Sequence, residues 1–346
     1  ETDGDVRITR TWIFPATGKN VLKRLGNYLS FAVSSLFALM RIPHADILFV
    51  ESPPLFLCVT AWLVSWLRKQ KLCINISDLW PDSVVALGMM KDGLFVRAAY
   101  RLEQWLYCQA WCVNAVTEGI VETLANEKGV PRSKVLFLPN GVDVELFHPQ
   151  TADKEYAETL GLVNKRIFAY TGVHGYAQGL DVIIGAADLL RNRKEIAFLL
   201  VGEGPEKSRL QAECQQLSLT NVHFLEAQPS TLMPRIFALT TACIVPLRKL
   251  ELFKGARPSK LFPPLACSKP VIFCGEGEAA AIVRSVGCGI VVPPEDSVSL
   301  AASIQMLSDS PEDAVGMGQK GRLLVESEYS WYEIVKRWLI QLSFVS

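Results

Sequence analysis

Three short segments in the second half of the chain combine glycine with residue types that bind anions. Residues 171–179 read Thr-Gly-Val-His-Gly-Tyr-Ala-Gln-Gly, residues 202–205 read Gly-Glu-Gly-Pro, and residues 254–260 read Lys-Gly-Ala-Arg-Pro-Ser-Lys. Glycine lets a ligand approach the backbone closely, and the N-terminus of a helix that follows such a loop attracts negative charge. The combination is typical of a site for a phosphate or a diphosphate.

The third segment adds two cations to a possible helix start. Ser259 is expected to cap the helix that follows it, and Arg257 and Lys260 would add positive charge beside the exposed N–H groups. The alternative is a capped surface helix whose two cations are simply solvated. Because both glycine-rich loops belong to the same stretch of chain, we favour the phosphate site.

The elements around these loops form an alternating series of strands and helices. Short apolar runs predict strands at 166–171, 196–201, 222–225, 242–246, 270–274 and 289–292. Helical patterns separate them at 179–191, 206–217, 231–239, 259–266 and 278–286. Parallel strands with crossover helices imply a doubly wound sheet, in which ligands bind at the carboxyl ends of the strands.

The first half of the chain shows a second series of the same kind. Strands are predicted at 46–50, 72–76, 112–116 and 135–138, with a helix of about 14 residues between the first two and another at 96–111. The polar segment 147–164 is predicted to link the domains. We therefore expect one domain at 1–150 and another at 165–329, with residues 330–346 as a terminal helix that rejoins the first.

Composition limits the class of protein. The chain has 346 residues, half of them apolar, which is enough for two cores. Lys+Arg and Asp+Glu both number 35, so a general electrostatic footprint for nucleic acid is not expected. The nine cysteines lie mostly in apolar runs without a C-x-x-C pair, which indicates reduced thiols in a cytosolic protein. The apolar run 55–67 is too short to span a membrane.

Residues 19–41 predict a basic amphipathic helix. Lys19, Lys23, Arg24 and Arg41 flank a run rich in leucine and aromatic residues. Such a helix can lie in the headgroup region of a membrane. The alternative is an ordinary core helix with a basic edge.

Several strings resemble one enzyme family. They are Pro258-Ser259-Lys260-Leu261-Phe262, Leu265-Ala266-Cys267-Ser268-Lys269-Pro270-Val271-Ile272, Leu200-Val201-Gly202-Glu203-Gly204-Pro205, Asp78-Leu79-Trp80-Pro81-Asp82-Ser83, Val116-Thr117-Glu118-Gly119-Ile120 and Leu138-Pro139-Asn140-Gly141-Val142-Asp143. Together they resemble the group-1 (glycogen-synthase-like, retaining) glycosyltransferases, in particular the bacterial surface-polysaccharide branch with fucosaminyl- and colanic-acid-type transferases.

The resemblance implies an α/β GT-B fold, with two Rossmann-like domains facing across a cleft. It places the nucleotide-sugar on the C-terminal domain and the acceptor on the N-terminal one. It also implies transfer with retention and without a metal ion or another cofactor, and no D-x-D-type metal motif stands in a matching position. Helix N-termini after Gly172–Gly179 and at Ser259, with Arg257 and Lys260, would hold the donor diphosphate.

The candidate site residues follow from the motifs and the resemblance together. On the donor side they are Gly172, Gly175, Gln178, Gly179, Gly202, Gly204, Arg257, Ser259, Lys260, Leu261, Glu276 and Glu278. Asn140 and Glu118 are assigned to the acceptor side, where Glu118 either lines the cleft or partners a helix N-cap. Asp78 either orients the acceptor hydroxyl or caps the following turn. His174 either donates to the donor sugar or phosphate, or bonds only to backbone.

The chain departs from the family pattern at three places. Pro263 and Gly255 stand where two glutamates eight residues apart are usual, so Glu276 or Glu278 would have to hold the donor ribose. Gln178 stands where many relatives place a phosphate-binding lysine. The first strand and glycine-rich loop of the acceptor domain are not found, so we expect a chain shortened by a few tens of residues and without full activity.

These inferences predict a glycosyltransferase that moves a sugar, most simply from a UDP-sugar, to a lipid-linked acceptor in surface polysaccharide synthesis. It would lie at the inner face of the bacterial plasma membrane. Two alternatives remain open, a non-catalytic scaffold of the same fold and an enzyme like UDP-N-acetylglucosamine 2-epimerase.

Overall fold

The chain divides into two compact α/β units. The computed structural model describes residues 1–15, 21–88, 90 and 93–345. The first unit comprises Glu1–Leu138 together with Trp338–Ser346, and the second comprises Pro139–Arg337. The division falls at Leu138, so residues 139–150, which we predicted in the first domain, belong to the second.

The first unit is built on a four-stranded parallel sheet in the order β3-β4-β5-β6. Its strands are β3 (Ile47–Ser52), β4 (Lys71–Ile76), β5 (Cys112–Ala115) and β6 (Val135–Phe137). The helices are α1 (Val21–Arg41), α2 (Leu55–Arg68), α3 (Asp82–Ala86), α4 (Leu94–Gln109) and α5 (Glu118–Asn126). A short hairpin of β1 (Thr2–Asp3) and β2 (Val6–Arg7) precedes them. The four predicted strands and the 14-residue helix are confirmed.

The two faces of this sheet are covered differently. Side chains of α2, α4 and α5 pack with Leu72, Ile74 and Val113 in the main core of the unit. On the opposite face, Cys73 and Cys112 pack with Leu136 and with residues near the end of the chain. The segment 338–345 thus belongs to this unit, and it completes a face that the first 138 residues leave open.

The second unit has a six-stranded parallel sheet in the order β12-β11-β10-β7-β8-β9. Its strands are β7 (Arg166–Thr171), β8 (Ile196–Val201), β9 (Val222–Leu225), β10 (Thr240–Pro246), β11 (Val271–Cys274) and β12 (Gly289–Val292). All six were predicted. The strands are almost wholly apolar because helices bury both faces of the sheet.

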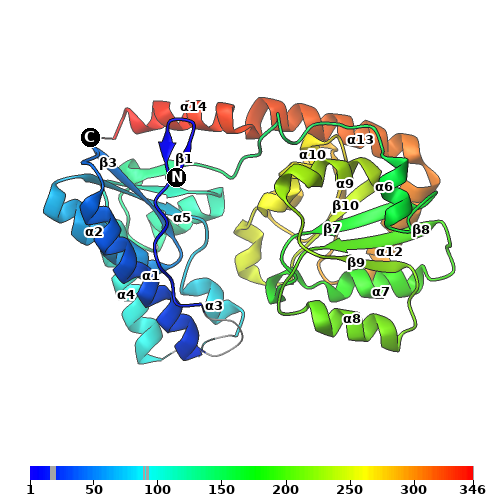
Figure 1. Cartoon of the computed structure of the whole chain (residues 1–346), viewed down its shortest axis with the longest axis horizontal. Helices are drawn as coiled ribbons and strands as arrows, with labels where there is room; N and C mark the ends of the chain where they lie inside the picture. Colours follow the sequence, from blue (N-terminus) through cyan, green and yellow to red (C-terminus); the bar gives the residue numbers. More distant parts are fainter. Residues whose placement is uncertain (16–20, 89, 91–92, 346) are drawn as a thin grey trace. The chain divides into compact units, whose positions relative to one another are not determined.

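Helices cover the two faces of this second sheet (Figure 1). These helices are α6 (Lys154–Thr159), α7 (Asp181–Leu189), α8 (Lys207–Gln216), α9 (Met233–Leu239), α10 (Phe262–Ala266), α11 (Glu278–Val286), α12 (Ser297–Asp309) and α13 (Pro311–Leu324). The last helix, α14 (Trp331–Leu342), begins in the second unit, but its residues from Trp338 onward belong to the first. Alternate residues of β7 separate the faces. Phe168 and Tyr170 pack with α7, α8 and α12, whereas Ile167 and Ala169 pack with α9.

The segment 147–164 is not a free linker. It contains α6, and its apolar residues Phe147, Tyr156, Leu160 and Leu162 pack into the core beside α9. The sequence pattern predicted a linker because these apolar residues are interspersed with charged ones. Helices α12 and α13 were also not predicted, although they form part of the second unit.

Candidate functional site

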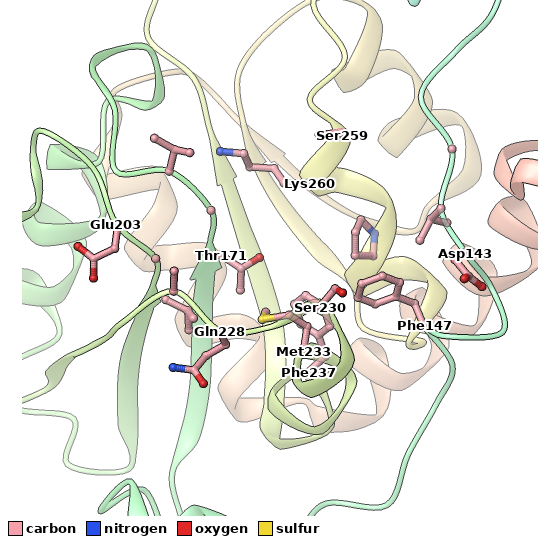
Figure 2. Close-up of a pocket in the computed structure, with 18 of the residues that line it drawn as sticks. Asp143, Phe147, Thr171, Glu203, Gln228, Ser230, Met233, Phe237, Ser259 and Lys260 are labelled. Carbon is pink, nitrogen blue, oxygen red and sulfur yellow. The ribbon is translucent and has the colours of Figure 1, made fainter. Parts of the chain in front are cut away.

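A cavity of about 810 Å³ lies at the carboxyl ends of β7, β8 and β9. Its glycines and polar side chains are Gly141, Asp143, Thr171, Gly172, Gln178, Gly202, Glu203, Gln228, Ser230, Ser259 and Lys260. Its apolar wall includes Val142, Phe147, Val173, Met233, Phe237, Pro263 and Trp331. Figure 2 shows Phe147, Met233 and Phe237 grouped together in one part of the wall, with Lys260 elsewhere in it. The cavity therefore offers both a polar and an aromatic surface.

The two glycine-rich loops pack directly against each other at this cavity. The amide of Gly172 donates to the carbonyl of Val201 at 2.9 Å, and the amide of His174 donates to that of Glu203 at 2.8 Å. A Cβ at Gly202 would lie 2.0 Å from the oxygen of Gly172, and one at Gly204 would lie 2.5 Å from that of His174. Both glycines also have positive φ values, +142° and +155°. Glycine is therefore required at 202 and 204 by the approach of one loop to the other.

This packing changes the expected way of holding a phosphate. The amides of Gly172, His174, Gly175 and Gln178 all donate to protein carbonyls, so they are already engaged. In the first turn of α7, the amide of Val182 likewise donates to the Gly179 carbonyl. The glycines at 175 and 179 shape the loop: a Cβ at Gly175 would meet Gln178, and Gly179 has φ +58°.

Lys260 is the cation that the structure brings to the cavity. Its Nζ donates to the Tyr170 hydroxyl at 2.9 Å, and that hydroxyl donates to the carbonyl of Val173 at 2.6 Å. Burial of the ammonium lowers the pKa of Lys260 to about 8. A desolvated cation near the glycine loops is well suited to an anionic ligand, which would restore its charge balance.

Arg257 does not line this cavity, contrary to the prediction. Its guanidinium is buried, where it donates to the Tyr329 hydroxyl at 3.1 Å and lies 3.6 Å from Oε1 of Glu278. Phe262 stacks on the Tyr329 ring at 4.4 Å. Arg257 and Glu278 thus balance each other inside the fold, which explains why neither is presented to a ligand.

Ser259 lines the cavity but is not a helix cap. It begins a 3₁₀ turn, Ser259–Leu261, and the side chain that precedes α10 makes no capping hydrogen bond. Pro263 and Pro264 occupy the first turn of this five-residue helix, so two of its amide donors are missing. Leu261 is fully buried and holds the turn in place. The prediction that Ser259 caps this helix is therefore wrong.

His174 is buried beneath the loop rather than exposed in the cavity. Its ring lies 5.7 Å from that of Tyr170 and 6.2 Å from that of Phe224, centroid to centroid. Within the described residues neither ring nitrogen has a hydrogen-bond partner. Burial, assisted by the nearby Lys207 ammonium, lowers the pKa of His174 to about 4, so the ring is neutral at pH 7. Direct contact with a ligand in the cavity would require the loop to move.

Glu276 is also placed away from this cavity. It lines a separate hollow of about 280 Å³ with Arg248 and Lys254, and its carboxylate lies 3.8 Å from Nζ of Lys254. Pro263, by contrast, does line the main cavity. The structure therefore brings neither Glu276 nor Glu278 to the place where a substitute for the ribose carboxylate was expected.

The candidate acceptor residues divide between the two units. Asp78 comes just after β4. The residue as a whole is exposed, but the atoms around its carboxyl partly desolvate it and raise its pKa, while a hydrogen bond from Ser83 opposes that rise. Glu118 is exposed in the first turn of α5, and the helix cap is Thr117, which accepts from the amide of Ile120 at 3.1 Å. Asn140 belongs to the second unit. Asp78 and Glu118 follow neighbouring strands of the first sheet.

Several residues at the cavity were not predicted. Gln228 and Ser230 follow β9, so the rule that ligands bind at the carboxyl ends of parallel strands would have found them. Phe147 and Trp331 are far from the glycine loops in sequence and carry no such signal. In the described part of the chain, no group of three or more metal-ligating side chains occurs and no helix has the length and hydropathy of a membrane span.

Comparison with known protein families agrees with this architecture. Residues 153–324 match the family of glycosyl transferases group 1, and residues 1–141 match a glycosyl transferase 4-like domain. The putative colanic acid biosynthesis glycosyl transferase WcaI of Escherichia coli is 30% identical over 88% of this chain and 76% of its own. The probable glycosyltransferase WbjE of Pseudomonas aeruginosa is 26% identical over 92% of this chain and 80% of its own.

Solved structures show the same fold. Sucrose-phosphate synthase from Thermosynechococcus elongatus superposes with a TM-score of 0.79 at 19% identity, over 100% of this chain and 86% of that one. Anabaena HepE in complex with UDP-glucose gives a TM-score of 0.75 at 16% identity, over 94% and 84% of the two chains. The predicted GT-B fold is confirmed, and this chain belongs to the group-1 glycosyltransferases.

Proposed function

We propose that this enzyme transfers a sugar from a UDP-sugar to a lipid-linked acceptor in the synthesis of a surface polysaccharide, with retention of configuration. The observation that carries the proposal is the cavity of the second unit, where Lys260 stands beside two interlocked glycine loops. The complexes of Anabaena HepE with UDP and UDP-glucose support a uridine nucleotide. The names of the colanic acid and O-antigen relatives support the polysaccharide.

Lys260 has the central part in the proposed mechanism. As the bond between the sugar and the diphosphate breaks, negative charge grows on the leaving phosphate. A preformed cation stabilises that charge more in the transition state than in the ground state. Because four amides of the glycine loop already donate to protein carbonyls, we assign Lys260 a larger share of this stabilisation than the helix N-termini. We expect a chelator to leave the activity unchanged.

Donor binding can be tested by thermal stabilisation with UDP and with a panel of UDP- and GDP-sugars. We expect UDP to stabilise the protein and Lys260→Met to weaken UDP binding about 10- to 100-fold, the worth of a charge-assisted contact. The matched control is Lys194→Met, which removes the same charge near the amino end of β8 and should bind UDP normally. Absence of UDP binding by the folded wild-type protein would favour a scaffold, and epimerisation of the donor alone would favour the epimerase.

The surface of α1 supports the membrane part of the proposal. Leu29, Val33, Phe37 and Met40 form an exposed apolar stripe along the helix, while Ala32 faces α2. Trp12, Ile13 and Phe14 are exposed beside α1, held there by hydrogen bonds such as that from the Ser34 hydroxyl to the Trp12 carbonyl. Lys23 and Arg41 are exposed basic residues of the same helix. Lys19 and the side chains of Leu22 and Arg24 lie outside the described residues.

An apolar stripe with basic residues is suited to the inner face of a bacterial plasma membrane, where anionic lipids attract it. Sedimentation with vesicles of phosphatidylglycerol and phosphatidylethanolamine tests this. We expect Val33→Asn with Phe37→Ser to reduce the bound fraction severalfold. Val315→Asn with Leu323→Ser changes two exposed apolar residues of the second unit and should not. Equal vesicle binding by both double variants would show that α1 is not the contact.

A further inference from the structure

Three ionisable side chains of the first unit meet at a largely buried place, where burial raises the pKa of Glu103 to about 7 although Lys128 opposes the rise. Nζ of Lys128 lies 2.7 Å from Oδ2 of Asp82 and 2.8 Å from Oε2 of Glu103. Lys128 is 8% exposed and Glu103 is 0% exposed. Taking charges out of water is costly unless each is paired, so this cluster is held by its mutual contacts.

Aromatic side chains complete the cluster. The Tyr107 hydroxyl donates to Oε1 of Glu103 at 3.0 Å, and the Tyr100 hydroxyl donates to Oδ1 of Asp82 at 3.4 Å. Nζ of Lys128 also lies 4.6 Å from the centroid of the Tyr100 ring. The members come from α3, from α4 and from the segment after α5, so one lysine ties three parts of the unit together.

Asp82 connects this cluster with Asp78, the residue assigned to the acceptor side. Asp82 is the first residue of α3, which begins four positions after Asp78. The amide of Ser83 donates to the carbonyl of Leu79 at 2.9 Å, and the Ser83 hydroxyl interacts with the Asp78 carboxyl. The Asp82 charge also acts on Asp78, raising its pKa. A residue that fixes Asp82 and offsets its charge, as Lys128 does, therefore also affects the position and the pKa of Asp78.

We propose that Lys128 is a positioning residue for the acceptor side, which holds the turn 78–83 and shields Asp78 from the charge of Asp82. The inference rests on the proposed glycosyl transfer and on the first of the two roles expected for Asp78, orientation of the acceptor hydroxyl. Lys128 itself is buried and does not touch a substrate. Its effect passes through Asp82, so it depends on charge as well as on packing.

The test is an NMR titration of protein labelled with aspartate that carries ¹³C in its carboxyl group. The Asp78 signal is assigned with Asp78→Asn, and no substrate is needed. Lys128→Met with Glu103→Gln removes the buried lysine together with its fully buried partner, so that Glu103 is not left without Lys128, while the half-buried Asp82 is kept. We expect the midpoint of Asp78 to rise by about 0.5 to 1 in pKa, the effect of an unshielded like charge nearby.

Adding Asp82→Asn to that double variant should return the midpoint toward the wild-type value. Lys128→Arg should preserve it, since the charge is kept. Lys134→Met, which removes a different lysine of the first unit, should leave it unchanged. If the double variant is folded and Asp78 titrates as in the wild type, Lys128 has only a structural role. UDP binding is measured separately, so failure of the donor proposal would not be mistaken for failure here.

Discussion

In each unit the proposed site lies at the carboxyl ends of the strands of its own parallel sheet, but different features shape the two sites. In the second unit the cavity is shaped by backbone, where glycine loops approach so closely that Gly202 and Gly204 have no room for a Cβ. In the first unit the turn 78–83 is held by side chains, through the buried contacts of Lys128. A site made of backbone is sensitive to added volume, whereas a site held by ion pairs is sensitive to charge.

The largest expected effect comes from adding one methyl group to the glycine loops. Gly202→Ala would place a Cβ 2.0 Å from the Gly172 oxygen at a positive φ. We expect a loss of about 3 kcal/mol or more in the free energy of unfolding, together with the loss of UDP binding. Chemical denaturation and calorimetry with UDP measure these quantities.

Gly161→Ala is the matched control for this change. Gly161 also has a positive φ, +68°, but no atom lies within 4 Å of the position that a Cβ would take. It should lose only about 1 kcal/mol, from backbone strain alone. Equal losses for the two variants would show that close approach of the loops is not what requires glycine at 202.

In the first unit, we expect a smaller but still large effect from Trp338→Ala. Nε1 of Trp338 donates to Oδ1 of Asn114 at 2.8 Å, and its ring packs edge-on against Phe49. Loss of this packing and hydrogen bond should destabilise the first unit by about 2 to 3 kcal/mol. Faster amide exchange in β5 and β6, with β7 and β8 unchanged, would be the signature.

Trp66→Ala removes an exposed tryptophan from the same unit and is the control for Trp338→Ala. It should leave amide exchange in β5 and β6 near the wild-type rate. If Trp338→Ala gave the same pattern as Trp66→Ala, the terminal segment would not support the sheet.

A moderate effect should appear in the pH dependence of donor binding. Because the pKa of Lys260 is about 8, the free protein loses this charge as the pH rises through that value. An anion binds the charged form, so UDP affinity should fall about tenfold from pH 7 to pH 9. Lys260→Arg should bind UDP with a flatter profile, since a guanidinium stays charged. Calorimetric titrations at both pH values compare the two proteins, and parallel profiles would contradict the assignment.

The smallest expected effect is a stabilisation. Gly316 lies within α13 with no atom near its Cβ position, so Gly316→Ala should raise the stability of the second unit by about 1 kcal/mol through helix propensity. Two residues on, a Cβ at Gly318 would lie 2.0 Å from the Ser268 oxygen, and Gly318→Ala should destabilise instead. Calorimetric melting of both variants would show whether contact alone decides which glycines the second unit requires.

Much of the fold could be predicted because the strands are continuous apolar runs. All six strands of the second sheet and four of the first were recognised in this way, since a parallel strand is buried on both faces. Helices α12 and α13 were missed, and the polar spacing of 147–164 concealed residues that pack into the core.

The site was less predictable because its details depend on distant partners. Lys260 was expected at the site and lines the cavity, but the burial of Arg257 depends on Tyr329, 72 positions away. Ser259 begins a 3₁₀ turn before a helix whose first turn contains Pro263 and Pro264, and these two prolines are a local signal against an N-terminal anion site. Residue types predicted an anion site, while tertiary contacts decided which of the two cations lines the cavity.

The terminal segment has a consequence for the order in which the protein is made. Phe137, the last residue of β6, forms two backbone hydrogen bonds with the side-chain amide of Gln341, which lies 204 positions later. During translation, the whole second unit is therefore synthesised before the segment 338–345 can pack on the first sheet. In a protein truncated before Trp338, the second unit should remain folded and the first unit should be destabilised. To produce the first unit alone, residues 338–345 would have to be joined to residue 138 by a short tether.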